Sequence, residues 1–434
     1  MTTPTTPTYT PERTRNIVLL LAGSVALMMT GFGIIMPVFA RRLGEFGDGV
    51  AALGWMTMAF ALSQLIAAPI MGSLTDKYGR RPFVLIALFA FALTNVGYLL
   101  AQSTPQFIAV RFMGGALTAG LFPAAMGIVA DIVPEEDRAR WIGVIMGGYG
   151  VGFIFGPALG GFLYDGWGFA APFLLSAALS VLALTAAFIV VPETHPPSAR
   201  AAKAKAGEMM EKRPFSSRAK ANTAAYWRSL PRPISRLATL LFVDFVGAFA
   251  FAFIEPQMVF YFYDDLGWST TQFGVVVGAY GLAMVFGQLV LARSSDKYGR
   301  KPIIVIGILC TSLLYIGLRS FTMFAPIVAG AMVAGLGGAL IAPAASAFYL
   351  DITDRAHQGR IVGIKESALA LGGVLGPLLV IVASKVTDAQ GIFTIAAGLV
   401  LMSGLTAVVF LHEDKKITSS AETEPVEVAA PHSI

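Results

Sequence analysis

The stretch Gly72–Pro82, GSLTDKYGRRP, lies between two long apolar segments and decides the architecture of the chain. It returns almost unchanged as ARSSDKYGRKP at residues 292–302, an offset of 220 residues. Other features keep the same offset: a proline at 123 and 343, an aspartate at 131 and 351, and a Gly-Pro pair at 156 and 376. Matched features this far apart indicate an internal duplication. We therefore predict two related halves.

The composition indicates that lipid surrounds both halves. Hydrophobic residues make up 56% of the 434 residues and charged residues 13%, with a mean hydropathy of +0.71. Soluble domains carry about 25% charged residues. Twelve apolar segments are each near the roughly 20 residues that cross a bilayer, and they must be helices because lipid offers the backbone no hydrogen bonds. The predicted spans are residues 16–40, 50–74, 83–101, 106–131, 140–164, 169–191, 237–263, 271–291, 303–320, 325–349, 361–384 and 391–411.

The positions of the 31 lysines and arginines predict the orientation. The tails and the connections on one side hold 25 of them, whereas the other side holds Arg41, Arg42, Arg319 and Lys385. Basic residues favour the cytoplasmic side, so both tails and the repeated loop are predicted to lie in the cytoplasm of a cell-membrane protein. Because the basic excess is a topology signal, nucleic acid is not an expected partner.

The predicted organisation has five parts. A cytoplasmic tail (1–15) precedes a first six-helix bundle (16–191), a cytoplasmic linker (192–236), a second bundle (237–411) and a polar tail (412–434) predicted to be disordered. The linker carries ten basic residues. It is either a solvated tether or includes an interfacial helix near 199–212 that touches anionic lipid. The N-terminus lacks signal-peptide features, and Cys310, the only cysteine, excludes an intrachain disulfide.

The repeated loop carries a family resemblance. Its glycines allow a tight reversal, and Pro82 fits the first turn of the next helix. The loop resembles the signature of the major facilitator superfamily, Gly-x-Leu-x-Asp-x-x-Gly-Arg-Arg/Lys-Pro. The first copy matches throughout, whereas the second has Ala292 and Ser294 in place of Gly and Leu. The resemblance covers about residues 13–412. It implies an all-α fold of twelve membrane helices in two pseudo-symmetric six-helix bundles around a cavity lined by the first, fourth, seventh and tenth spans.

The resemblance also implies a cytoplasmic gate in which charges of this loop latch the two bundles. The residues that match the gate are Asp76, Arg80, Arg81, Asp131, Asp296 and Arg300.

A glycine stripe marks the fifth span. Glycines recur every fourth residue and leave one bare face that another backbone can approach closely. The span resembles the motif of drug:proton antiporters within the superfamily, although plain helix packing would also explain it. The motif residues are Gly148, Gly152, Gly156, Pro157, Gly160 and Gly161; the matching positions in the eleventh span are Ala368, Gly372, Gly376 and Val380.

Three charged residues within spans are candidates for proton coupling. Arg111 in the fourth span is costly in lipid, about 2.5–3.5 kcal/mol at a helix centre, unless it snorkels to the nearby surface. Asp244 and Glu255 lie eleven residues apart on the seventh span and hence nearly on one face. A carboxyl in a low-dielectric cavity takes up a proton near neutral pH. Arg111 is expected to promote release of that proton.

The first span departs from the antiporter pattern. Many members carry an acid there, but Gly31–Pro37 reads GFGIIMP. If protons drive this protein, the carrier has moved to the seventh span; otherwise proton coupling itself is in doubt.

The predicted cavity combines methionine and aromatic side chains with a few polar groups, which suits varied lipophilic ligands, and a deprotonated Glu255 would favour cationic ones. The candidate lining residues are Met28, Phe32, Met36, Gln64, Tyr149, Gln257, Tyr280 and Gln288, with Met29, Phe249, Phe251 and Phe253 beside them.

We therefore predict proton-coupled efflux of lipophilic small molecules or drugs by alternating access, with the monomer as the working unit. Two alternatives stay open: an exporter or flippase for one amphipathic metabolite or lipid, and a non-transporting membrane sensor. No nucleophile-base set, phosphate-binding loop or metal-ligand spacing is visible, so we expect no enzyme, cofactor or metal.

Overall fold

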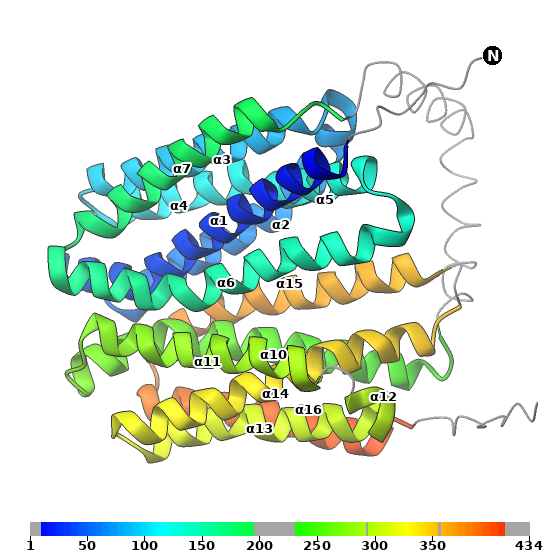
Figure 1. The fold of residues 1–434 in the computed structure, drawn as a ribbon. Coiled ribbons are helices and arrows are strands. Elements are labelled where there is room, and N and C mark those ends of the chain that lie inside the picture. The colour runs from blue at the N-terminus through cyan, green and yellow to red at the C-terminus, as the bar shows by residue number, and fades with distance from the viewer. Residues whose placement is uncertain (1–9, 195–230, 292–293, 355–356, 413–434) are drawn as a thin grey trace, which may run out of the picture.

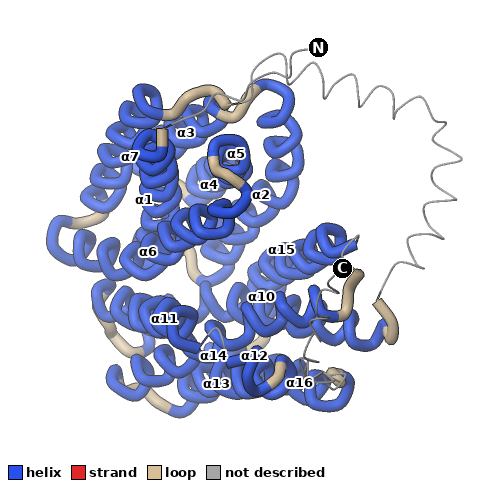
Figure 2. The backbone as a smooth tube through the Cα atoms, turned by 45° about the vertical axis from the view of Figure 1, so that its right-hand side comes forward, coloured by secondary structure: helices blue, strands red, loops and turns tan. Residues whose placement is uncertain are grey.

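The computed structural model describes residues 10–194, 231–291, 294–354 and 357–412. Twelve helical segments in this part of the chain are long and apolar enough to cross a membrane, which confirms the predicted number. Figure 2 shows helices and connecting loops, and no strand, among these residues. The predicted interfacial helix at 199–212 and nearly all of the tail lie outside the described residues.

The helices fall into two groups related by the repeat (Figure 1). The first group comprises α1 (Pro11–Glu45), α2 (Val50–Tyr78), α3 (Arg81–Leu100), α4 (Thr104–Thr118), α5 (Leu121–Ile132), α6 (Glu135–Trp167) and α7 (Ala170–Val190). The second comprises α10 (Ile234–Phe260), continued by the π-turn η1 (Tyr261–Asp265), α11 (Thr270–Leu291), α12 (Ser294–Tyr298), α13 (Arg300–Ser320), α14 (Phe324–Asp351), α15 (Gln358–Ala383) and α16 (Ala389–Phe410).

Two helix boundaries differ from the expectation for local reasons. α1 begins at Pro11, before the predicted residue 16, because Thr10 caps it by accepting a hydrogen bond from the Arg13 amide. The fourth span is two helices, α4 and α5, separated at Ala119–Gly120. Pro123 has no N–H to donate to the Ala119 carbonyl, which accounts for the break.

The glycine stripes pack helices within each half. A methyl group at Gly152 would lie 2.3 Å from the Ala26 carbonyl oxygen of α1, and one at Gly156 would lie 2.6 Å from that of Thr30. In the second half, a methyl group at Gly376 would lie 2.7 Å from the Phe249 carbonyl oxygen of α10. The two stripes therefore hold α6 on α1 and α15 on α10 at backbone contact, as the bare faces predicted.

The two halves meet mainly through two further helix pairs, α6 with α11 and α2 with α15. We call the face where α1 begins and α16 ends the termini face, at the right of Figure 1, and the opposite face the distal face. Gly274 lies on Pro157 and Ala158, and Gly54 on Pro377 and Ile381. All these residues lie in the distal halves of their helices, so the halves are packed together most closely there.

Candidate functional site

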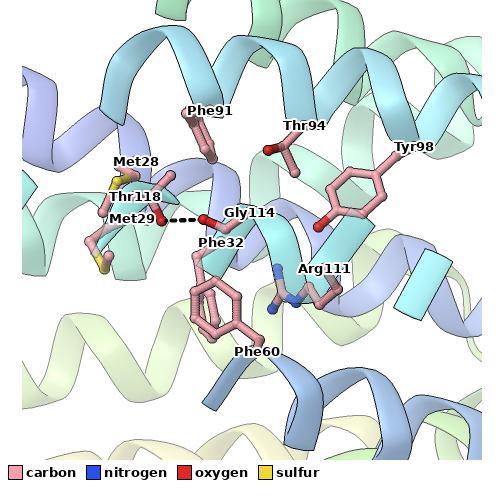
Figure 3. A pocket seen from close by; sticks show the side chains of 10 residues that line it. All are labelled: Met28, Met29, Phe32, Phe60, Phe91, Thr94, Tyr98, Arg111, Gly114 and Thr118. Carbon is pink, nitrogen blue, oxygen red and sulfur yellow. Dashed lines mark hydrogen bonds between the residues drawn. The ribbon is translucent and has the colours of Figure 1, made fainter. Parts of the chain in front are cut away.

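Arg111 lies inside the first bundle, on α4, and does not reach the membrane surface. Its residue exposure is only 6%, which rules out the snorkelling alternative. The guanidinium carbon lies 4.3 Å from the ring centre of Phe60 and 5.0 Å from that of Phe32. The Tyr98 hydroxyl points toward the guanidinium and interacts with it electrostatically (Figure 3). Aromatic faces thus replace water around this buried cation.

The second bundle buries a carboxyl group, that of Glu255. It lies on α10, is 8% exposed, and interacts through its charge with Arg111. Pro256 follows it inside the helix and leaves one backbone carbonyl without its usual donor. Two of the three predicted coupling residues, one in each bundle, are therefore buried and interact electrostatically.

Asp244 lies in a separate charged cluster within the second bundle. Asp244 is 8% exposed, so its carboxylate does not open to water. The Tyr349 hydroxyl of α14 donates a hydrogen bond to its carboxylate at 2.9 Å. Lys365 and Glu366 of α15 interact with it through their charges, and the Lys365 ammonium donates to the Ser346 hydroxyl at 3.0 Å. Asp244 thus has a local counter-charge of its own.

The predicted gate residues bind within their own bundles in this conformation. Arg80 lies 2.9 Å from Asp131 of α5 and 3.9 Å from Asp76, measured between nitrogen and oxygen atoms. In the second half, Arg300 pairs with Asp296 and lies 3.2 Å from Asp351. Arg80 therefore joins the turn after α2 to the end of α5, and Arg300 joins the turn after α12 to the end of α14.

The first copy of the gate is tied down further by the chain that follows α7. The Arg80 amide donates to the Glu193 carboxylate at 3.1 Å, and the Thr194 hydroxyl donates to Asp131 at 2.7 Å. Arg81 donates to the Phe188 carbonyl oxygen at 2.6 Å. The start of the linker thus binds the predicted gate residues, which the sequence did not predict.

We expect Asp131→Asn to lower stability more than the matching change Asp351→Asn. Asp131 serves both Arg80 and Thr194 and is 23% exposed, whereas the Asp351 side chain is 45% exposed. A hydrogen-bonded, partly buried ion contributes about 2 kcal/mol, and an exposed pair less than about 1 kcal/mol. Thermal unfolding midpoints of the two variants in detergent measure the difference. Equal shifts would contradict this view of the linker.

The hydrogen bonds that join the two bundles lie at the distal face in the described part of the chain. Arg41 donates to the Trp268 carbonyl oxygen at 2.7 Å, and Tyr263 donates to the Pro37 carbonyl oxygen at 2.9 Å. Asp165 accepts from both the amide and the hydroxyl of Thr271, at 2.7 and 2.6 Å. This set, which we call the distal lock, closes the bundles on that face.

Removing Asp165 is expected to open the distal face. Asp165→Ala deletes two hydrogen bonds to a charged acceptor, each worth about 1.5–3 kcal/mol before solvent competition. Spin labels on cysteines placed at Gln102 and Val386, both exposed at the distal face, would report longer distances in a Cys310→Ser background. Glu45→Ala is the matched control, because Glu45 pairs with Arg42 in its own bundle. Unchanged distances in Asp165→Ala would show that the lock does not hold the bundles.

Comparisons with known proteins agree with this architecture. The family model described as the Major Facilitator Superfamily matches residues 21–263 and 237–431. The chain belongs to that superfamily. Its relatives include the tetracycline resistance protein, class C, of Escherichia coli, at 28% identity over 85% of this chain and 89% of that protein. Multidrug resistance protein 2 of Bacillus subtilis (strain 168) is 24% identical over 84% of this chain and 88% of its own.

A solved structure shares the fold of this Major Facilitator protein. The human organic anion transporter MFSD10 superposes with a TM-score of 0.62 and 22% identity, covering 92% of this chain and all of that chain. This family and these folds are those of transporters, not enzymes. In the described residues, no group of three or more His, Cys, Asp or Glu side chains could hold a metal ion.

The other predicted cavity residues of this Major Facilitator protein are dispersed. Met28 and Phe32 do line the pocket beside Arg111. Tyr280 stacks near Phe251, with ring centres 6.4 Å apart, while Phe249 and Phe253 are buried where α10 packs on α15. The side chain of Met36 lies outside the described structure. Four others are not among the lining residues of this pocket: Gln64, Tyr149, Gln257 and Gln288.

The sequence did not lead us to the residues that surround Arg111 and Asp244. The pocket includes Phe91, Thr94 and Tyr98 of α3, whose three- and four-residue spacing marks one helix face and was the available signal. For Asp244, the available signal was Lys365, a cation in an apolar span.

Proposed function

We propose that this protein exports lipophilic small molecules from the cytoplasm by proton-coupled alternating access. The observation that carries the proposal is that each bundle buries a charged side chain, Arg111 in the first and Glu255 in the second, and that Arg111 lines an apolar pocket. Buried ionisable groups in membrane spans are expensive to retain and mark ion or substrate pathways. A deprotonated Glu255 would favour cationic members of this substrate class.

The relatives support the direction and the class of substrate. Their names refer to resistance to tetracycline and to multiple drugs, and the chain spans most of each relative's length. The basic residues counted above support a cytoplasmic position of the termini face in the cell membrane. With that orientation, the distal lock closes the outer side of the protein.

The transport cycle follows from these positions. With the cavity reached from the cytoplasm, Glu255, aided by Asp244, is deprotonated and a substrate binds. The bundles then rock, the distal lock opens, and the gate loops around Asp76 close the cytoplasmic side. External protons displace the substrate outward. A charge that crosses 100 mV contributes about 2.3 kcal/mol, so the membrane potential alone is a substantial driving force.

Reconstitution tests the proposal. Vesicles that contain the protein and an internal pH dye are given a proton gradient, and ethidium, then tetracycline, is added. We expect each transported substrate to evoke proton movement that protein-free vesicles lack. Substrate flux without proton movement would overturn the coupling and leave a uniporter or flippase. No flux with a wide panel of substrates would favour a dedicated metabolite exporter or a sensor.

A further inference from the structure

A wide hollow lies on the outside of the first bundle, between α3 and α7. Its volume is about 470 Å³, and it is largely open on its outer side. Five of its six lining side chains are apolar, and those of Phe89 and Phe188 are 58% and 64% exposed. We call this hollow the α3–α7 groove. The residues that line it are Leu85, Ile86, Phe89, Leu184, Thr185 and Phe188.

The α3–α7 groove faces away from the second bundle. Figures 1 and 2 show α3 and α7 side by side on the outer side of the first bundle. The lining residues belong to the start of α3 and the end of α7, the ends that lie at the termini face. From Arg81, the first residue of α3, the groove extends to Phe89, about 12 Å along the helix axis. The hydrocarbon part of one leaflet is about 15 Å thick, so the groove runs through most of the leaflet on the termini side.

Arg81 lies at the end of the groove, at the termini face. Its Nη2 nitrogen donates to the Phe188 carbonyl oxygen at 2.6 Å, and its guanidinium carbon lies 5.2 Å from the centre of the Phe188 ring. A guanidinium carries five N–H groups, and in the described residues no carboxylate pairs with that of Arg81. The side chain is partly exposed. Arg81 therefore keeps its charge and several donors for another molecule.

The charge of the molecule that fits beside Arg81 follows from its neighbours. The acids around this turn bind Arg80 instead: Asp131 and Asp76 through its guanidinium, and Glu193 through its amide. The positive charge of Arg81 is thus not neutralised by the described chain. A phosphate group can accept two N–H groups of one guanidinium side by side. A zwitterionic lipid carries its own cation, which Arg81 repels, so a lipid with a net negative charge fits better.

We propose that the α3–α7 groove binds an anionic phospholipid, with the acyl chains along the groove and the phosphate on Arg81. This inference goes beyond the proposed transport function and does not depend on it. With the orientation proposed above, the lipid belongs to the cytoplasmic leaflet. The two neighbouring arginines then have separate roles, since Arg80 holds the turn to α5 while Arg81 faces lipid.

Native mass spectrometry of the full chain in detergent tests this inference. The protein is titrated with dioleoylphosphatidylglycerol or with dioleoylphosphatidylcholine, which share their acyl chains and differ in net charge. The measured quantity is the dissociation constant of the first bound lipid. We expect the wild type to bind phosphatidylglycerol more tightly than phosphatidylcholine. Glycerol 3-phosphate, which carries the charge without the acyl chains, should not compete with phosphatidylglycerol.

Three variants separate the charge from the groove. Arg81→Gln should weaken phosphatidylglycerol binding roughly fivefold, the effect of one cation near an anionic lipid surface, and leave phosphatidylcholine binding nearly unchanged. Thr185→Trp fills the groove from an exposed position on α7 and should weaken the binding of both lipids. Arg138→Gln is the matched control, because Arg138 lies near the start of α6 and also donates to a backbone carbonyl oxygen, that of Ala130 at 3.0 Å. It should leave both dissociation constants close to those of wild type.

Several results would overturn the inference. They are equal binding of the two lipids by wild type, an unchanged lipid preference in Arg81→Gln, an equal loss in Arg138→Gln, or unchanged binding of both lipids in Thr185→Trp. Competition by glycerol 3-phosphate would also overturn it, because the site would then bind free phosphate. If Arg81→Gln does not fold, Arg81→Lys decides. Lysine keeps the charge but cannot bind phosphate side by side, so the preference for phosphatidylglycerol should fall, and an unchanged preference would contradict the role of Arg81.

Discussion

Glu255→Gln is expected to abolish substrate-evoked proton movement in reconstituted vesicles. Glutamine keeps the size of the side chain but cannot exchange a proton, and it leaves the buried Arg111 without its opposite charge across the bundles. The pH-dye signal should fall to the level of protein-free vesicles, while the variant still inserts into the membrane. The measurement is the initial rate of proton movement after substrate addition.

Asp264→Asn is the matched control for this change. Asp264 lies on the same span, nine residues beyond Glu255, but it is exposed and lies in η1 at the distal face. The Asp264→Asn variant should show proton movement close to that of wild type. Wild-type proton movement in Glu255→Gln would show that the proton carrier lies elsewhere, and Asp244 would then be the next residue to change.

Gly152→Ala is expected to produce the largest loss of stability. The added methyl group would lie 2.3 Å from the Ala26 carbonyl oxygen and 2.7 Å from both the Met29 Cβ and the Thr30 amide nitrogen. Two of these atoms belong to the α1 backbone, which cannot turn aside as a side chain can. Overpacking costs about 1–3 kcal/mol even where side chains can rearrange, so we expect a cost at or above the top of that range.

Gly147→Ala provides the opposite expectation within the same helix. A methyl group at Gly147 would meet nothing within 4 Å. Alanine is favoured over glycine in a helix by up to about 1 kcal/mol, so this variant should be neutral or more stable. Thermal unfolding and size-exclusion profiles in one detergent compare the two. Similar unfolding midpoints for Gly152→Ala and Gly147→Ala would show that α6 can move away from α1 without loss of stability.

Much of the fold could be predicted because its determinants are local or repeated. The lengths of the apolar segments predict the membrane spans. The division into two related halves follows from the 220-residue offset, which separates Asp76 from Asp296. The glycine stripe predicted backbone contact, since a helix face without side chains admits a close neighbour. The break between α4 and α5 was harder, because Pro123 can either kink a helix or divide it, and packing decides.

The candidate site could be predicted only in part. Arg111 and Glu255 stood out as charges in apolar spans, yet the interaction of their charges across the two bundles depends on how the bundles dock. Tyr349 and Ser346 gave no signal, because tyrosine and serine are ordinary in membrane helices and gain significance only beside Asp244 and Lys365. Glu193 was assigned to a linker, whereas it binds the Arg80 amide.

The two glycine-packed helix pairs have a consequence for how the halves diverged. The α1–α6 and α10–α15 contacts are equivalent under the duplication, but the buried charges are not: methionine occupies position 36, the counterpart of Glu255, and alanine occupies position 331, the counterpart of Arg111. The two halves thus share one scaffold, while each carries its own charged residues. A chimaera made of two first halves would contain the glycine-packed helix pair twice and would lack Asp244 and Glu255 of α10.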